Sequence, residues 1–543
     1  MKNRIFKKVI ILGVGLSFFT QSCTDLSEDL YSDLPADKFF QSEEQFIAAL
    51  GSAYSSFAGI GNHSGLWTLN ELASDELVVT TKGGDWYDGG VLIQMHQHKY
   101  TIDHPFVNGA WGWVYGGINT ANRLIYTFEQ VGTPEAEAFI AELRAIRALW
   151  YYWLVDAFGN VPLVTDFLDD EPPSTTSRAE IYNFIESEIT EILPLLPESK
   201  DQSTYGRMTK WAALAIRAKL YLNAGVFKGT PEWQKAADDA KAIIDGAKYN
   251  LETVYADNFS VSNSGSAENI LVYPYDKVFA TGFNWPMMTL HYASQGVYNL
   301  TAQPWNGYSA VEEFYNSYID PVKNPGPQGP VWKGLAVDAN DDRIPDTEGT
   351  IDSRLSNFVV GPQYLQDGTK AVDPGFEGAS AAQPDPDGTN LNFTPYINEI
   401  YPNGWRQAGA RIGKYEYERG GTDNMSNDFV IFRYSDVLLT RAEALWRLNN
   451  GDAEALALVN QVRERALVDA FDALTAENLL AERGREMFAE MTRRQDLIRF
   501  GKFNDAWWEK DASTSTYNLF PIPKAQRDVN PNLSQNPGYP GGD

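Results

Sequence analysis

Aromatic side chains stand out in segments without helical periodicity. They lie close to glycine, asparagine and aspartate, and they are Trp67, Trp86, Tyr87, Trp285, Trp305, Tyr308, Trp332 and Trp405. A sugar ring carries C–H groups on its face and hydroxyls at its rim, so an indole can bury the face while Asp, Asn or Arg binds the rim. Aromatic contacts of this kind lose little rotamer entropy. The pattern favours carbohydrate binding, and half-buried packing is the alternative for any single ring.

Side chains suited to catalysis do not form a complete set. His96 and His98 are two residues apart and would share one face of a strand, with His104 nearby. No Glu-flanked helical pair or cysteine ligand accompanies them, which argues against zinc. Among the 72 acidic residues, nothing singles out a pair for glycoside cleavage. We therefore expect no catalytic residues and a protein that is not an enzyme.

One acidic segment has the alternating oxygen ligands of a calcium loop. These residues are Asp338, Asn340, Asp342 and Asp346, but Arg343 replaces the glycine of the sixth loop position. An acidic, solvated loop is the favoured interpretation. No cofactor is required, and a structural calcium ion is the alternative.

Strong helical periodicity occurs in two parts of the chain. From Glu135, apolar residues recur at steps of four and three up to Trp153, and Gly159 and Pro162 then stop the helix. The other expected helices cover about 178–193, 209–223, 231–245, 436–448, 453–466 and 476–488. Asp452 and Thr475 are the expected N-caps of the last two. Paired helices with short turns resemble tetratricopeptide pairs, although no clean 34-residue repeat is present, and a generic α-bundle is the alternative.

The segment between these helical parts differs in character. Residues of about 251–428 are rich in proline and glycine turns and show little helical periodicity. We expect an irregular lobe with short strands, inserted between helical blocks at about 37–250 and 429–543 of one domain.

The N-terminus has the order of an export signal. Four positive residues precede an apolar run over 9–19, and Ser22 directly precedes Cys23. The run is shorter than the about 20 residues of a membrane span, so 1–22 is expected to be a cleaved signal peptide. Ser22-Cys23 resembles the bacterial lipobox, in which the cysteine is acylated, and residues 23–36 then form a flexible leash. An ordinary secreted protein is the alternative.

Charge and cysteine content restrict the partners. The formal net charge is −28, which opposes binding to nucleic acid and disfavours polyanionic glycans. Cys23 is the only cysteine, so the mature chain forms no internal disulfide.

Short motifs in a fixed order connect the chain to a known family. They stand at 111–122 (WGWVYGGINTAN), 142–151, 158–163 (FGNVPL), 206–213, 432–444, 496–501 (DLIRFG), 520–523 and 535–539. Behind a lipobox, this order resembles the SusD/RagB family of outer-membrane, nutrient-binding lipoproteins of Bacteroidetes. The resemblance implies a mainly α fold with tetratricopeptide-like helix pairs and an irregular ligand-binding lobe. It also implies lipid anchoring at the cell surface and a SusC-like TonB-dependent transporter as partner.

The resemblance places the ligand site by region, in the loop after the first helices and in the central lobe. The matching residues are Trp67, Asp85, Trp86, Tyr87, Trp285, Trp305, Asn306 and Tyr308. We expect Trp285 and Trp305 to form a stacking platform and Asp85 to accept from sugar hydroxyls. A neutral glycan resembling β-glucan is favoured, with fructan or xylan close behind. A peptide-binding scaffold of the same uptake system and, less favoured, a glycan-active enzyme are the alternatives.

Overall fold

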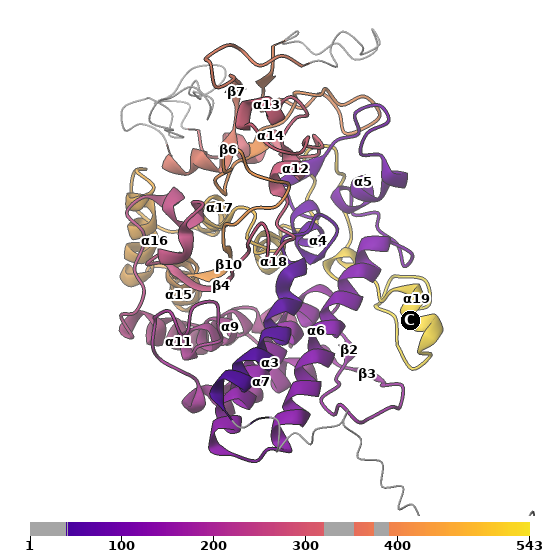
Figure 1. Ribbon diagram of the computed structural model, residues 1–543, viewed down its shortest axis with the longest axis vertical. Helices are drawn as coiled ribbons and strands as arrows, with labels where there is room; N and C mark the ends of the chain where they lie inside the picture. Colours follow the sequence, from indigo (N-terminus) through magenta and orange to yellow (C-terminus); the bar gives the residue numbers. More distant parts are fainter. Residues whose placement is uncertain (1–39, 41, 320–351, 374–389, 543) are drawn as a thin grey trace, which may run out of the picture.

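The computed structural model of the chain describes residues 40, 42–319, 352–373 and 390–542. Figure 1 shows long helices in the lower part of the molecule and short elements joined by loops at the top. In the described residues, strands occur only as five antiparallel two-stranded sheets. The prediction of a mainly α fold with helix pairs and an irregular lobe is confirmed.

The first helical block contains long helices that pack against one another, together with shorter ones. They are α3 (Glu43–Ser55), α4 (Leu66–Leu72), α5 (Val91–His96), α6 (Pro105–Glu129), α7 (Pro134–Ala157), α8 (Arg178–Ile192), α9 (Lys210–Leu222), α10 (Ala224–Phe227) and α11 (Trp233–Asp245). Strands β1 (Leu77–Val79), β2 (Val161–Pro162) and β3 (Thr175–Thr176) lie in the same block. Helix α6 packs on α7, α7 on α8, and α9 on α11. The four helices expected here from periodicity are therefore confirmed.

Side-chain caps begin two helices nearer the C-terminus, at the residues that the sequence predicts. Asp452 accepts from the Ala455 amide at 2.8 Å at the start of α16 (Ala453–Arg465). Thr475 accepts from the Asn478 amide at 3.1 Å at the start of α17 (Ala476–Met487). Each cap satisfies an amide that has no partner inside the helix.

Helix α6 was not expected from the sequence, although it is 25 residues long. Its sequence contains several glycines, which weaken a helix and hide its periodicity. Packing explains one of them, because a Cβ atom at Gly117 would lie 2.2 Å from the buried Trp150 ring of α7. Close contact between the two helices thus outweighs local propensity.

The lobe consists of loops and short elements. Its α helices are α12 (Trp285–Thr289), α13 (Ser294–Tyr298) and α14 (Glu312–Asn316), and its strands are β4 (Asn269–Tyr273), β5 (Tyr308–Ala310), β6 (Phe358–Val359), β7 (Gly361–Pro362), β8 (Asn392–Phe393) and β9 (Arg411–Ile412). Strand β5 pairs with β1, with Tyr308 opposite Val79. The lobe is therefore joined by backbone hydrogen bonds to the first helical block.

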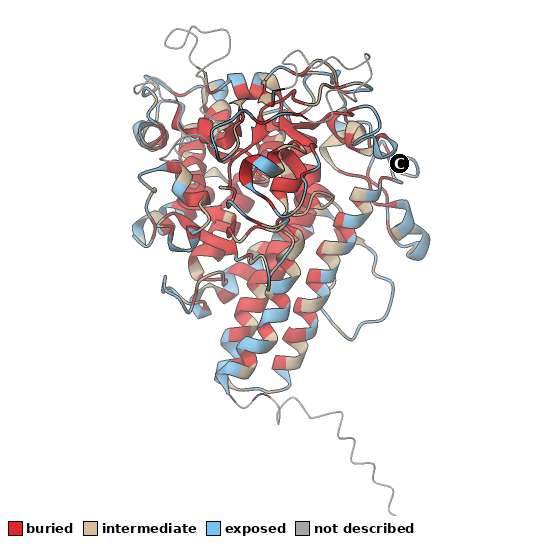
Figure 2. Cartoon of the chain, turned by 45° about the horizontal axis from the view of Figure 1, so that its top comes forward, coloured by how far each residue is buried: buried red, intermediate tan, exposed pale blue. Residues whose placement is uncertain are grey.

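The second helical block follows β10 (Phe429–Arg433), which pairs with β4 of the lobe. It contains α15 (Tyr434–Leu448), α16, α17, α18 (Arg493–Arg499) and α19 (Lys524–Val529). Figure 2 shows buried residues in the helical blocks and the lobe, and the buried apolar residues form one continuous cluster. The division of the chain into a leader, a leash and one domain stays a prediction. Among the described helices, none combines the length and apolar character needed to cross a membrane.

Candidate functional site

A tight turn after β1 presents successive polar and aromatic side chains. Lys82 and Asp85 pair through backbone hydrogen bonds of 3.0 and 3.3 Å. Gly83 between them has a φ of 70°, in the left-handed region that favours glycine. Trp86 and Asp88 also have positive φ, at 62° and 43°, which costs about 1–3 kcal/mol in a non-glycine residue. Such strained residues are concentrated at functional sites.

Two contacts hold Trp86 in this conformation. Its Nε1 donates to the backbone oxygen of Trp305. Its ring lies against Gly307, where a Cβ atom would approach the ring to 2.5 Å. A side chain at position 307 would therefore displace the ring.

The turn forms one wall of an open hollow with a volume of about 500 Å³. The hollow is lined by His63, Asp85, Trp86, Asp88, Tyr292, Gln303, Pro304 and Trp305. Small-molecule sites typically occupy about 300–1,000 Å³ and combine aromatic walls with a few polar groups. The hollow has both properties.

Trp305 is the exposed aromatic ring of the hollow. Its side chain is 37% exposed and meets the His63 ring edge-on at 5.3 Å between centroids. The Trp305 amide donates to Met287 O at 2.7 Å and the Gly307 amide donates to Met288 O at 2.9 Å, so this loop is fixed to α12. The ring is thereby held partly in solvent, where it can contact a ligand.

Asp85 is the acceptor that is oriented by its neighbours. The Tyr292 hydroxyl donates to Asp85 Oδ2, and the Arg406 guanidinium lies 4.9 Å from the centre of the Tyr292 ring. Burial and the Asp85 carboxylate raise the pKa of Tyr292, so its hydroxyl keeps its proton. Tyr292 fixes one carboxylate oxygen and leaves the other able to accept a hydrogen bond.

Of the eight residues expected in the ligand site, three line the hollow: Asp85, Trp86 and Trp305. Tyr87 follows Trp86 and is 44% exposed. Their direct role in ligand binding is a proposal, developed below.

The other four expected residues are buried, and here the prediction is wrong. Trp67, Trp285, Asn306 and Tyr308 have 0% exposure. The centroids of the Trp67 and Trp285 rings lie 4.7 Å apart, and Trp67 Nε1 donates to Ala489 O at 3.0 Å. An enclosed ring has no free face for a sugar, so the expected platform of Trp285 and Trp305 does not exist. Sequence context placed these residues outside long helices but carried no information about their burial.

Five residues of the hollow were absent from the predicted set: His63, Asp88, Tyr292, Gln303 and Pro304. Asp88 belongs to the same glycine-rich turn as Asp85, and that proximity was an available signal. Tyr292 is about 200 positions away along the chain, and only the tertiary fold brings it to Asp85.

The histidines considered for zinc have structural contacts instead. His96 Nε2 lies 2.7 Å from Trp508 O, His98 Nε2 lies 2.9 Å from Ala73 O, and both rings are buried. His96 ends helix α5 and does not lie on a strand. Within the described ranges, no three side chains of His, Cys, Asp or Glu come together as a metal site.

Several predicted positions lie outside the described residues. They are Cys23, the calcium candidates Asp338, Asn340, Asp342 and Asp346, and the loop residue Trp332. Lipidation and calcium binding therefore stay predictions. Trp405 is described, is half-buried, and has its ring 5.5 Å from that of Tyr396.

Known proteins resemble the chain along most of its length. The starch-binding protein SusD of Bacteroides thetaiotaomicron is 29% identical over 495 residues, which cover 87% of this chain and 85% of that protein. SusD-like protein P25 of Formosa agariphila is 25% identical, with 98% of this chain and 99% of that protein covered.

Solved structures share the fold. Surface glycan-binding protein A from Bacteroides thetaiotaomicron superposes with a TM-score of 0.70 at 20% identity, covering 92% of this chain and 100% of that one. The same protein in complex with laminarihexaose superposes with a TM-score of 0.68, also at 20% identity, covering 91% and 99%.

Two family models match the chain in sequence. One, described as starch-binding associating with outer membrane, matches residues 26–222. The other, described as the SusD family, matches residues 252–539, which is more than half of the chain. The motif order, the helix pairs with their inserted lobe and this match agree, and the chain belongs to the SusD family.

Proposed function

We propose that the protein binds a neutral oligosaccharide or polysaccharide in the hollow. The observation that carries this proposal is the partly exposed Trp305 ring in the same open hollow as the oriented Asp85 carboxylate. The ring offers a flat apolar surface to a sugar face, and the carboxylate accepts from a hydroxyl at the sugar rim. These contacts position a ligand and break no bond.

The charge of the hollow supports a neutral ligand. Asp85 and Asp88 both line it, and none of its described lining residues is Lys or Arg. Burial lowers the pKa of His63, so this ring is uncharged at neutral pH. Asp85 and Asp88 would repel sulfate or uronate groups there.

Relatives support a glycan as the ligand and a β-glucan as its first candidate. One curated relative is named a starch-binding protein. A structural neighbour is a laminarin-binding SusD-like protein, which superposes with a TM-score of 0.66 at 20% identity and covers 92% of this chain and 100% of that one. At 20% identity this similarity supports a shared fold. The ligand of the neighbour serves here only to choose which glycans to test.

The family suggests how binding is used. We propose that acylated Cys23 anchors the protein at the cell surface, in the outer membrane. Bound glycan then passes to a SusC-like TonB-dependent transporter. The matching family model is described as associating with the outer membrane, which supports the location, and the transporter follows from the family resemblance.

The test is calorimetric titration of the purified protein with laminarin, starch, xylan, fructan and alginate. We expect binding to at least one neutral polymer and none to alginate. Trp305→Ala should weaken that binding at least tenfold, about 1.4 kcal/mol, because the stacking surface is lost. Trp446→Ala, a half-buried tryptophan of α15, is the control and should bind normally.

Other outcomes would overturn the proposal. Equal affinity of Trp305→Ala and the unchanged protein would remove Trp305 from the site. New reducing ends after incubation with a glycan would reveal an enzyme. Peptide binding without a response to any glycan would favour the scaffold alternative.

A further inference from the structure

Lys82 is a buried lysine at the start of the turn that lines the hollow. It is 5% exposed, and its Nζ donates to Thr80 O at 3.1 Å and to Gly307 O at 3.4 Å. Both acceptors are uncharged backbone carbonyls. Within the described ranges, no ion pair joins Lys82 to a carboxylate. A lysine ammonium is rarely buried without such a partner, because the loss of its hydration costs free energy.

The surroundings of Lys82 add to this cost. Burial and the nearby Arg411 guanidinium lower the pKa of Lys82 well below its ordinary value, and Arg406 acts in the same direction. The Asp85 carboxylate acts in the opposite direction, but more weakly than burial. The charged form of Lys82 is therefore disfavoured in the folded chain. A titratable side chain kept under such conditions is a candidate for a role other than stability.

Lys82 contacts the loop that carries Trp305, the exposed ring of the hollow. Trp86 Nε1 donates to Trp305 O, and Lys82 Nζ donates to Gly307 O. The two donors belong to the same turn, and their acceptors lie two residues apart. The turn therefore holds the loop at two carbonyl groups, one on each side of Asn306.

The loop has a conformation that needs this support. Asn306, between the two held carbonyls, has a φ of 60° and 0% exposure. A positive φ is unfavourable for a residue other than glycine, and it persists where surrounding contacts enforce it. The three amides of residues 305–307 donate to backbone carbonyls within residues 287–290 at 2.7–2.9 Å. Helix α12 and its C-cap thus support the loop on one side, and Trp86 and Lys82 support it on the other.

The backbone of Lys82 is itself fixed. The Lys82 amide donates to Asp85 O at 3.0 Å, and the amides on either side of it donate to carbonyls of the segment 400–402 at 2.8 and 3.1 Å. The described lining of the hollow does not include Lys82. Its influence on a ligand therefore passes through the residues that it holds.

We propose that Lys82 is a positioning residue, whose buried ammonium fixes the Trp305 loop to the turn and so pre-forms the hollow for a glycan. This inference rests on the proposed function. It accounts for a buried ammonium whose acceptors are carbonyl groups, because rigid placement of Trp305 is gained at a cost in stability. A pre-formed site binds more tightly, since less conformational entropy is lost on binding.

The test compares Lys82→Met with the unchanged protein, because methionine keeps an unbranched side chain and removes the amine. Gly307 O then loses this donor, and the loop should open more often. We expect amide hydrogen exchange of residues 305–307, followed by mass spectrometry, to become about twofold to tenfold faster. Calorimetric affinity for laminarin or starch should fall by about twofold to tenfold. The Tm should stay equal or rise, because a buried ammonium held by uncharged acceptors is removed.

Lys219→Met is the matched control. Lys219 is 6% exposed, but its Nζ forms an ion pair with Asp436 at 2.7 Å. The same substitution there should lower the Tm, because it removes a cationic partner from a buried carboxylate. Exchange at residues 305–307, measured well below the melting transition, and glycan affinity should not change.

A chemical rescue separates the amine from the volume of the side chain. Cys23 is the only cysteine of the chain, so Lys82→Cys combined with Cys23→Ala contains a single thiol. Alkylating this thiol in the unfolded chain with bromoethylamine, followed by refolding, restores an amine at the length of lysine. Alkylation with 1-iodopropane adds an apolar group of similar size. The amine adduct should restore the exchange rate and the affinity, and the propyl adduct should restore neither.

The outcomes separate this inference from the proposed function. Unchanged exchange and affinity in Lys82→Met, or equal recovery with both adducts, would overturn the positioning role while glycan binding stands. If the unchanged protein binds neither laminarin nor starch, amide exchange still decides whether Lys82 fixes the loop, and the polymer panel decides whether the proposed function fails.

Discussion

The Asp85 carboxylate is held in the hollow by a chain of side-chain contacts. Tyr292 donates to it, Arg406 covers the Tyr292 ring at 4.9 Å, and Arg406 Nε lies 3.5 Å from Asp373 Oδ2. His291 Nε2 lies 3.2 Å from the same oxygen. Glycan affinity should thus depend on the contacts that orient Asp85 as well as on Asp85 itself.

Replacing Tyr292 by Phe tests this dependence. The variant keeps the ring under Arg406 and removes the hydroxyl, so Asp85 loses its orienting bond. A hydrogen bond of this kind contributes about 0.5–1.5 kcal/mol, and we expect glycan affinity to fall by about twofold to tenfold in calorimetry. Tyr126→Phe is the control, and unchanged affinity of Tyr292→Phe would contradict the positioning role.

Some residues of the candidate site could be predicted from the sequence and others could not, and the difference can be explained residue by residue. Aromatic and acidic residues in a glycine-rich turn identify Asp85 and Trp86, because local sequence determines that turn. Trp285 has a similar local context but packs against Tyr415 at 5.2 Å. Whether a loop tryptophan is buried depends on distant segments, so its exposure does not follow from neighbouring residues.

A pair of buried carboxyl groups outside the lining of the hollow gives the protein a pH-sensitive feature. Glu71 accepts from the Met491 amide at 2.7 Å and Glu76 from the Ala489 amide at 3.0 Å, and both are almost fully buried. Burial raises the pKa of Glu71 to about 7. Burial and the neighbouring Glu71 raise the pKa of Glu76 well above its usual range.

Ionising the buried Glu71 carboxyl at neutral pH destabilises the folded state. Glu71→Gln cannot ionise and should therefore remove part of this destabilisation. The pKa of a Glu side chain in the unfolded chain is about 4.3. Between that pH and about 7, Glu71 therefore keeps its proton in the folded state but loses it in the unfolded state. The free energy of unfolding therefore has its full contribution from protonated Glu71 below about pH 4.3, and it falls as the pH rises to about 7. We expect the Tm of Glu71→Gln, relative to the unchanged protein, to rise between about pH 4.3 and 7. Parallel Tm curves would contradict this, and the exposed Glu464→Gln is the control.

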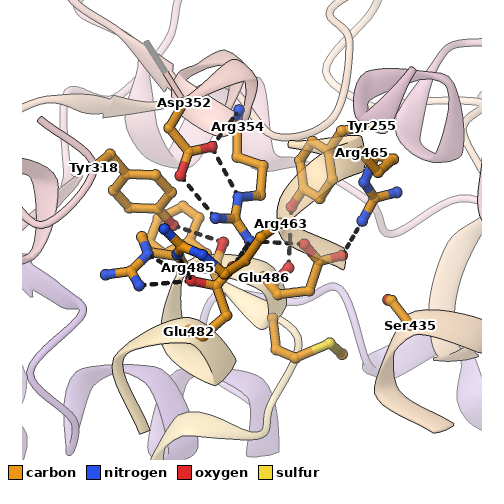
Figure 3. A network of polar contacts seen from close by, with 12 residues as sticks. Tyr255, Tyr318, Asp352, Arg354, Ser435, Arg463, Arg465, Glu482, Arg485 and Glu486 are labelled. Atoms are coloured by element: carbon orange, nitrogen blue, oxygen red, sulfur yellow. Dashed lines mark hydrogen bonds and ion pairs between the residues drawn. The ribbon is translucent and has the colours of Figure 1, made fainter. Parts of the chain in front are cut away.

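At the scale of elements, a buried ion-pair network joins the lobe to the second helical block. Arg354, in the 3-10 helix η6 (Ser353–Asn357), contacts Asp352 at 2.7 Å, Glu482 at 2.8 Å and Glu486 at 3.0 Å. Figure 3 shows Arg354 between Asp352 and the two glutamates of α17, with further arginines around them. The Arg354 side chain has 0% exposure.

Arg354→Met should therefore destabilise the protein strongly. Removal of one member of a buried ion pair leaves the others uncompensated and costs about 3–5 kcal/mol. Denaturant unfolding followed by circular dichroism measures this loss. Arg123→Met, at an exposed position of α6, should cost less than about 1 kcal/mol, and a similarly small effect at Arg354 would show that the network does not stabilise the fold.

The helical elements were more predictable than the lobe. Periodicity and caps are local, so α7, α8, α16 and α17 follow from the sequence to within a few residues. Helix α6 was missed because its glycines weaken the local helix signal, and Gly117 is explained only by its tertiary contact with the Trp150 ring. The register of β5 against β1 joins residues more than 200 positions apart, and no local pattern specifies such pairing.

At the scale of the whole molecule, α6 separates the start of the described chain from the hollow. Its 25 residues extend about 37 Å at 1.5 Å per residue. At the N-terminal end of α6, Nε2 of the N-cap His104 lies 3.0 Å from Val91 O. Val91 follows closely in sequence on the turn that lines the hollow. At its other end, Phe128 packs 5.1 Å from Phe40, and Figure 1 shows this end at the bottom of the molecule.

This separation leads to a prediction about Cys23. If acylated Cys23 is the anchor, Cys23→Ala should remove the protein from the membrane fraction of its host and abolish labelling with a radioactive fatty acid. The purified variant should bind glycan with unchanged affinity, because the chain enters the fold about one α6 length away from the hollow. Thr24→Ala keeps the cysteine and should remain in the membrane fraction. Membrane retention of Cys23→Ala would favour another mode of attachment, whereas a loss of glycan affinity in the purified variant would mean that the N-terminal segment reaches the hollow.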